Sequence, residues 1–294
     1  MPEVSIFASA VRPMIWPELF KSLDGTSVAI EVVFAGNAGE YDVRSASYSH
    51  GNFPFTYIHT ENIKPGQCYF LASQNCQGET LLYTADDAEY RGDIVGKAYK
   101  YWKSKNNKKL ILSLQVKESG YQLEQGQFID MNIHRFFGGG GNENNPLMAP
   151  IGLISREYFN ELGGLDRRYC AGQWENDIVM RAYQDGATVE VFGDTESYVD
   201  LDHYGKSLKI GECKDNADFL NRPFASSYQH DRQVLEQSWS IVDQHALMDL
   251  LHQGIHAIPI TAIKKISKVR LDRFEPYEDK DLLTKSQGYA GRWQ

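Results

Sequence analysis

Two short apolar segments on either side of a helical pattern constrain the fold of this chain most strongly. The first covers residues 4–10 and the second residues 28–35, and both have the continuous apolar composition of strands buried on both faces. A helical pattern around Leu19–Leu23 lies between them, after Arg12 and Pro13. Two strands that are joined through a helix indicate parallel neighbours in one sheet, because antiparallel neighbours need only a short turn.

The alternation of strand and helix patterns continues further along the chain. More strands are expected at 55–59, 79–84 and 110–116, and more helices at 68–75, 94–103 and 155–162. Ser155 and the Gly163-Gly164 pair are suitable caps for the last of these helices. The pattern predicts an α/β fold with a mostly parallel, open sheet flanked by helices, which binds ligands at the carboxyl ends of its strands.

The pattern changes near residue 226, where an amphipathic helix over 234–251 and a mixed tail are expected. No Pro- or Ser-rich linker precedes this change. We therefore divide the chain into a main domain, 1–225, and a C-terminal helical and mixed extension, 226–294, that packs on it as an appendage. Residues 136–145, rich in Gly and Asn, are expected to form a mobile loop suited to closing over an acceptor.

Charge and cysteine content narrow the class of partner. A net charge of −9 argues against general nucleic-acid binding, which depends on clustered Lys and Arg. The basic stretches 103–109 and 264–270 fit solvated helix ends or loops better than a surface for lipid or a charged acceptor. The four cysteines include no C-x-x-C pair, which fits a reducing compartment. Without a basic leader or an apolar run of about 18 residues, we expect a cytoplasmic protein with no transmembrane segment.

Paired carboxylates follow the strand expected at 79–84. Asp86 and Asp87 come directly after this apolar run, where an open α/β sheet binds its ligands. Mg²⁺ and Mn²⁺ prefer oxygen ligands and often combine one or two carboxylates with diphosphate oxygens. Acidic residues in such loops are also common helix caps. The pair is therefore compatible with nucleotide-diphosphate binding and with a purely structural role.

A second acidic group lies in the stretch Trp174–Arg181. If a helix begins here, Asp177 and Arg181 are four residues apart and share one face, so they can form a helix ion pair of small stability. Glu175 would then lie in the first turn of the helix. An acid in that position either complements the helix dipole or, beside a pocket, acts as a general base.

The order of these features resembles the inverting family 2 glycosyltransferases, which have the GT-A fold. The resemblance covers about residues 4–207 and rests on five features in order: Arg12 after the first strand, Gly36 after the second, Asp86-Asp87, Gly163–Tyr169 and Trp174–Arg181. It implies a nucleotide-sugar-binding fold and a metal-dependent enzyme. That enzyme would move a sugar, with inversion, from a nucleoside-diphosphate donor to the hydroxyl of a glycan or another acceptor. A UDP-sugar is the expected donor.

The resemblance also implies roles for single residues. Asp87 would hold Mn²⁺ or Mg²⁺, although Ala88 and Glu89 follow it where the family has D-x-D, and Asp86 would face the nucleotide. His203, in the stretch Asp202–Ser207, would complete the metal shell. The donor nucleotide would bind to residues at the ends of the first two strands: Ala8, Ser9, Arg12 and Gly36. Arg12 is equally suited to a phosphate contact and to a structural salt bridge.

Glu175 occupies the position of the family's catalytic base. Asp177 remains its rival, because Asn176 separates the two acids where the family has a further Asp. Two other functions stay open. A nucleotidyltransferase would release pyrophosphate, whereas a catalytically silent module for sugar nucleotides or glycans would bind without turnover. The chain lacks the basic, Gly-rich loop of the former after its first strand, and the presence of both acidic motifs disfavours the latter.

Overall fold

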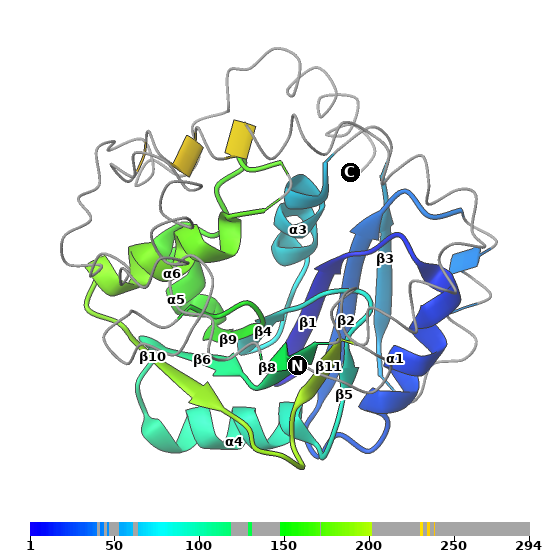
Figure 1. Cartoon of the computed structure of the whole chain (residues 1–294), viewed down its shortest axis with the longest axis horizontal. Helices are drawn as coiled ribbons and strands as arrows, with labels where there is room; N and C mark the ends of the chain where they lie inside the picture. Colours follow the sequence, from blue (N-terminus) through cyan, green and yellow to red (C-terminus); the bar gives the residue numbers. More distant parts are fainter. Residues whose placement is uncertain are drawn as a thin grey trace.

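The computed structural model describes residues 1–39, 42–43, 46, 53–60, 64–118, 129–130, 148–170, 172–201, 230–231, 234–235 and 238. A main sheet has the strand order β10-β6-β9-β4-β1-β2-β3 (Figure 1). Its strands are β1 (Val4–Ser9), β2 (Ile30–Gly36), β3 (Phe55–His59), β4 (Thr80–Tyr83), β6 (Leu110–Leu114), β9 (Gly152–Ser155) and β10 (Thr188–Phe192). All neighbouring pairs are parallel except those of β9, which runs antiparallel to β4 and β6.

Helices cover both faces of this sheet. On one face lie α1 (Trp16–Leu23), which follows the short 3-10 helix η1 (Pro13–Ile15), and α4 (Ile94–Lys105). On the other lie α3 (Pro65–Gln74), α5 (Arg156–Leu162) and α6 (Trp174–Gln184) (Figure 1). Side chains of β1 alternate between the two cores. Ile6 packs with α1 and α4, whereas Phe7 packs with α3, α5 and α6. Burial on both faces explains the unbroken apolar run of this strand.

A second, smaller sheet has the order β5-β11-β7-β8. Its strands are β5 (Glu89–Tyr90), β7 (Val116–Glu118), β8 (Ile129–Asp130) and β11 (Val199–Leu201). The single residue Gln115 separates β6 from β7, so the chain passes directly from the main sheet into the small one. Its backbone carbonyl accepts a hydrogen bond from Val199, while its N–H donates to Phe192 of β10. Gln115 therefore joins the two sheets.

The fold class predicted from the sequence is confirmed: a mostly parallel sheet is flanked by helices. Ser155 caps α5 by accepting a hydrogen bond from the N–H of Tyr158, and Gly163, with φ +108°, ends this helix as expected. Strand β9 was not predicted. Its four residues form a run too short to distinguish from the approach to a helix, and its Gly152 has no side chain. A Cβ at Gly152 would lie 2.2 Å from the Tyr83 hydroxyl.

Three expectations lie wholly or largely outside the described residues: the loop at 136–145, the helix over 234–251, and the division between 1–225 and 226–294. Of the 234–251 segment, 234, 235 and 238 are described, and they are helical. Within the described parts of the chain, no helix is long and apolar enough to cross a membrane.

Candidate active site

Asp86 holds the loop between β1 and α1. Its buried carboxylate accepts hydrogen bonds from the backbone N–H groups of Val11 (2.9 Å) and Arg12 (3.0 Å). It also accepts from the Arg12 guanidinium, with Nε at 2.8 Å, and from the indole N–H of Trp16 at 3.3 Å. A carboxylate with this many donors fixes the position of the loop that follows β1. Trp16, for which the sequence predicted no role, thus also contributes to this arrangement.

Arg12 joins Asp86 and its neighbour Asp87. Its Nη1 donates to Oδ2 of Asp87 over 2.7 Å, and its other terminal nitrogen pairs with Asp86. Burial lowers the pKa of the Arg12 guanidinium, but the charges of Asp86 and Asp87 outweigh burial and hold that pKa above its ordinary value. Of the two roles that the sequence left open for Arg12, this conformation shows the salt bridge. The two carboxylates and one guanidinium leave a net charge of −1 at the end of β4.

The other residues expected to bind the donor nucleotide lie at the same edge of the sheet. Ala8 and Ser9 end β1, next to Phe34 and Ala35 of β2. Gly36 ends β2 where the carbonyl of Ala10 approaches it, and a Cβ at Gly36 would lie 2.0 Å from that oxygen. The glycine therefore allows the ends of β1 and β2 to pack closely. The structure thus brings the predicted donor-binding positions and the Asp86-Asp87 pair to one edge.

Glu175 lies in the first turn of α6 and is half-buried. Burial raises the pKa of its carboxyl group from 4.5 to about 7. Backbone hydrogen bonds at Glu175 and Gln173 oppose this shift, and the charge of Asp231 adds to it. A carboxyl group with a pKa near neutrality can exchange a proton with a bound molecule at physiological pH.

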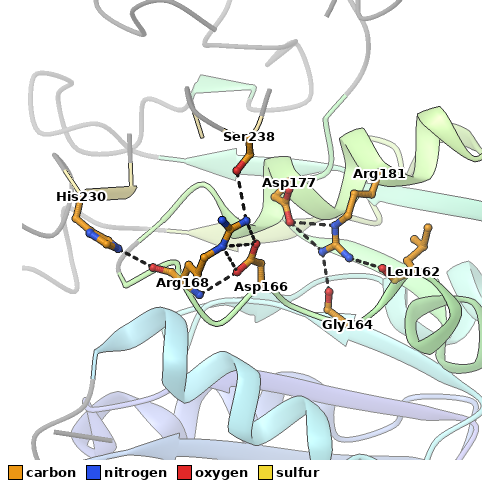
Figure 2. A network of polar contacts seen from close by, with 8 residues as sticks. All are labelled: Leu162, Gly164, Asp166, Arg168, Asp177, Arg181, His230 and Ser238. Carbon is orange, nitrogen blue, oxygen red and sulfur yellow. Dashed lines mark hydrogen bonds and ion pairs between the residues drawn. The ribbon is translucent and has the colours of Figure 1, made fainter. Parts of the chain in front are cut away.

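Asp177 has the structural partner that the sequence predicted. Its Oδ2 accepts from Nε (3.0 Å) and Nη2 (2.9 Å) of Arg181, so the ion pair four residues apart is confirmed (Figure 2). Arg181 also donates to the carbonyls of Leu162 (2.5 Å) and Gly164 (2.7 Å). Burial lowers the pKa of this guanidinium to about 10. Asp177 thus belongs to a buried brace between α6 and the end of α5, which is a stronger arrangement than the exposed pair expected from spacing alone.

Tyr69 of α3 connects the two acidic regions. Its hydroxyl donates to the carbonyl of Thr84 over 2.7 Å, two residues before Asp86. Its ring lies 4.3 Å, centroid to centroid, from that of Trp174, which directly precedes Glu175. Burial is the main cause that raises the pKa of Tyr69, and the charges of Asp86, Asp87 and Glu175 raise it further. The acids from β4 and from α6 therefore face one aromatic side chain. No sequence pattern indicates this role for Tyr69, because aromatic residues at helical spacing ordinarily indicate the core.

Two other sequence predictions have different outcomes. His203, proposed to complete the metal shell, lies outside the described residues. The basic stretch 103–109 matches the solvated helix end that was expected. Its lysines form ion pairs, with Lys103 bound to Glu79, Lys108 to Glu161 and Lys109 to Asp185. Together with Trp102 and Arg156, this stretch lines a hollow of about 560 Å³. The hollow lies where β4 begins, at the edge of the sheet opposite Asp86.

By its fold, this is a mostly parallel α/β protein. It has a polar site at the carboxyl ends of β1, β2 and β4. Solved structures of S. aureus TarS, a glycosyltransferase, share this fold. No protein-family model and no curated protein matches the sequence.

The complex of TarS 1-349 with UDP aligns with a TM-score of 0.54 at 15% identity, over 99% of this chain and 92% of that one. The complex with UDP-GlcNAc aligns with a TM-score of 0.52 at 14% identity, over 68% of this chain and 58% of that one. A longer TarS structure has a TM-score of 0.53 at 14% identity, with 98% and 55% covered. This chain thus spans little more than half of that longer TarS chain, and at these identities the likeness concerns the fold.

Proposed function

We propose that this chain is a glycosyltransferase that moves a sugar from a nucleoside-diphosphate donor, a UDP-sugar first among them, to an acceptor hydroxyl with inversion. One observation carries the proposal. Tyr69 links Thr84, beside the Asp86-Asp87 pair, to Trp174, beside Glu175, so the proposed donor-binding edge and the proposed base lie near one aromatic side chain. The likeness of the fold to TarS, solved with UDP and with UDP-GlcNAc, supports the choice of donor.

A divalent cation fits the acidic edge. The chemistry of the donor set is suitable, since Asp86 and Asp87 exceed the charge of Arg12 by one negative charge and offer oxygen ligands. Asp87 would hold Mn²⁺ or Mg²⁺, with His203 as the proposed second ligand, while Asp86 keeps the loop after β1 in place. When bound, the cation would supply positive charge against the diphosphate leaving group.

Glu175 would act on the acceptor. Its carboxylate would take the proton from the acceptor hydroxyl as that oxygen attacks the anomeric carbon on the face opposite the leaving diphosphate. A pKa of about 7 suits a base that must be ionised before the reaction and protonated after it. Asp177 would stay bound to Arg181 and hold the start of α6 at a fixed position.

Titration calorimetry with UDP, in Mn²⁺ and then in chelator, tests the donor and the metal together. We expect UDP to bind the folded protein far more tightly with Mn²⁺, and we expect Asp87→Asn to remove most of this gain. Equal affinity in both conditions would reject the metal-bridged site. Turnover assays then separate the alternatives: release of UDP from a UDP-sugar would indicate sugar transfer, and release of pyrophosphate from UTP and a sugar phosphate would indicate a nucleotidyltransferase. Binding without turnover in both assays would indicate a silent binding module.

A further inference from the structure

We propose that Cys170, His230 and Asp231 form a binding site for Zn²⁺ that is distinct from the Asp86-Asp87 pair. One ligand atom from each residue, a thiol sulfur, a ring nitrogen and a carboxylate oxygen, lies within 4.8 Å of the other two. Cys170 and Asp231 are buried, and His230 is half-buried. The site therefore joins the loop before α6 to the helical residues 230–231, which are distant in the sequence.

The donor set favours zinc over the hard cations proposed for the acidic edge. Thiolate sulfur and imidazole nitrogen are ligands that Zn²⁺ prefers, whereas Mg²⁺ and Mn²⁺ favour sites made of oxygen. Zinc lies about 2.0 to 2.3 Å from such ligands, which places tetrahedral ligand atoms about 3.5 Å apart. The cluster would have to contract by about 1 Å to hold the ion. Three protein ligands would leave the fourth position for water.

The histidine has the orientation that metal ligands require. His230 Nε2 lies 2.9 Å from the backbone carbonyl of Arg168 (Figure 2). A carbonyl oxygen can only accept, so Nε2 carries the hydrogen, and in the neutral ring the lone pair is on Nδ1. Metal-bound histidines commonly donate their other N–H to a carbonyl or carboxylate in this way, which fixes the tautomer and the ring. His230 would therefore bind through Nδ1.

The carboxylate is oriented as well. Asp231 accepts hydrogen bonds from the backbone N–H groups of Cys170 (2.7 Å) and Gly172 (2.9 Å), one to each oxygen. A carboxylate has about four lone-pair positions, and these two bonds use one on each oxygen. The same bonds hold the loop that leads into α6 and Glu175. Zinc would thus fasten residues 230–231 to the start of the helix that carries the proposed base. The ion itself would not touch the reacting groups.

Metal analysis of the full-length protein, purified without chelator, provides the first test. We expect a single equivalent of zinc, which Mg²⁺ or Mn²⁺ in excess does not displace. After zinc removal, titration with Co²⁺ should produce a thiolate-to-cobalt charge-transfer band in the near ultraviolet, because only a sulfur ligand gives this signal. Cobalt bound at Asp87 would give no such band, so failure here is distinguishable from failure of the proposed function.

Three variants identify the ligands. Cys170→Ser should abolish the charge-transfer band, whereas Cys76→Ser, which alters another buried free cysteine, should keep it. If Cys170→Ser does not fold, the half-buried position gives a second route: His230→Gln should weaken cobalt binding by more than the 10- to 100-fold typical of an outer-shell partner. A folded wild-type protein with neither zinc nor a cobalt band, or a band that persists in Cys170→Ser, would overturn the proposal. Asp231 would then serve only to anchor the loop.

Discussion

The end of β4 and the start of α6 each combine two acidic side chains with one arginine, but they use that arginine differently. Arg12 pairs with both Asp86 and Asp87, and the backbone of the loop that carries it donates to Asp86. Arg181 pairs with Asp177 and also donates hydrogen bonds to two backbone carbonyls. Glu175 lies outside that pair, two residues earlier on the same helix.

The pKa values reflect this difference. At β4, the charges of Asp86 and Asp87 raise the pKa of Arg12 despite its burial, so the arginine stays charged beside two carboxyl groups. At α6, burial lowers the pKa of Arg181 to about 10 and raises that of Glu175 to about 7. A region with two carboxyl groups to one guanidinium suits a cation, and a region with an acid that titrates near neutrality suits proton transfer. One fold thus separates the two tasks of the proposed reaction.

Replacing Glu175 by Gln tests this separation with the largest expected effect. The amide keeps the shape and the hydrogen bonding of the side chain but cannot accept a proton, so sugar transfer should fall by roughly 10² to 10⁴. Binding of UDP with Mn²⁺ should persist, because that depends on the β4 region. Initial rates and titration calorimetry measure the two quantities.

Glu157→Gln is a matched control, since Glu157 is an exposed acid in the first turn of α5. It should transfer sugar at the native rate. The assignment of the base would be reversed if Glu175→Gln were fully active while Asp177→Asn folded, bound UDP and had no activity. In that case the buried ion pair would itself be part of the catalytic machinery.

Replacing Asp177 by Asn should mainly lower stability. The sequence alone suggested the small cost of an exposed helix pair, but Asp177 and Arg181 are 0% and 4% exposed. Removing the charge of one partner leaves a buried guanidinium without its counter-ion, which typically costs about 3 to 5 kcal/mol. We expect the lower end of this range, because the amide oxygen still accepts a hydrogen bond. Urea denaturation measures the change in the free energy of unfolding.

The surface offers a contrast for this second variant. Lys108 forms exposed pairs with Glu157 and Glu161, so Lys108→Gln should lower the free energy of unfolding far less than Asp177→Asn does. Equal losses for Asp177→Asn and Lys108→Gln would show that the α6 pair contributes no more than a surface pair. The brace between α5 and α6 would then have to depend on the carbonyl contacts of Arg181.

Local patterns predicted those parts of the molecule that depend on neighbours in sequence. Strand β1 is buried on both faces, so its apolar run is unbroken, and the spacing of Asp177 and Arg181 directly predicts their ion pair. Strand β9 escaped prediction because its four residues form a run too short to distinguish from the approach to α5. The short strands β5 and β11 contain too few residues for any periodicity to be recognised.

The candidate site shows the same limit. The contact of Arg12 with Asp86 spans 74 residues, so the sequence offered it only as one of two roles for the arginine. Cys170 and Asp231 are 61 residues apart and match no metal-binding spacing. Tyr69 contacts Thr84 and Trp174 only because α3 and α6 cover the same face of the sheet. These relationships follow from the packing of elements, which a single sequence does not reveal.

The last expected effect is the pH dependence of stability that Glu175 causes. Its pKa is raised from 4.5 in the unfolded chain to about 7 in the folded protein, so the folded state binds more protons between these values. Its contribution to stability is therefore greatest below pH 4.5, falls as the pH rises towards 7, and is constant above that. The full difference is at most about 3 kcal/mol, from 1.36 kcal/mol for each pKa unit. Asp231, Tyr69 and Tyr83 are the titratable groups linked electrostatically to Glu175, and burial keeps both tyrosines neutral in this range.

Urea denaturation of the wild type and of Glu175→Gln, from pH 5 to 8, measures this effect. Because the variant cannot titrate at position 175, the difference between the two unfolding free energies isolates this one carboxyl group. The variant should become progressively more stable relative to the wild type as the pH rises. A difference that stayed constant over this range would mean that Glu175 is ionised throughout, and the contrast between the β4 region and a titrating α6 region would no longer hold.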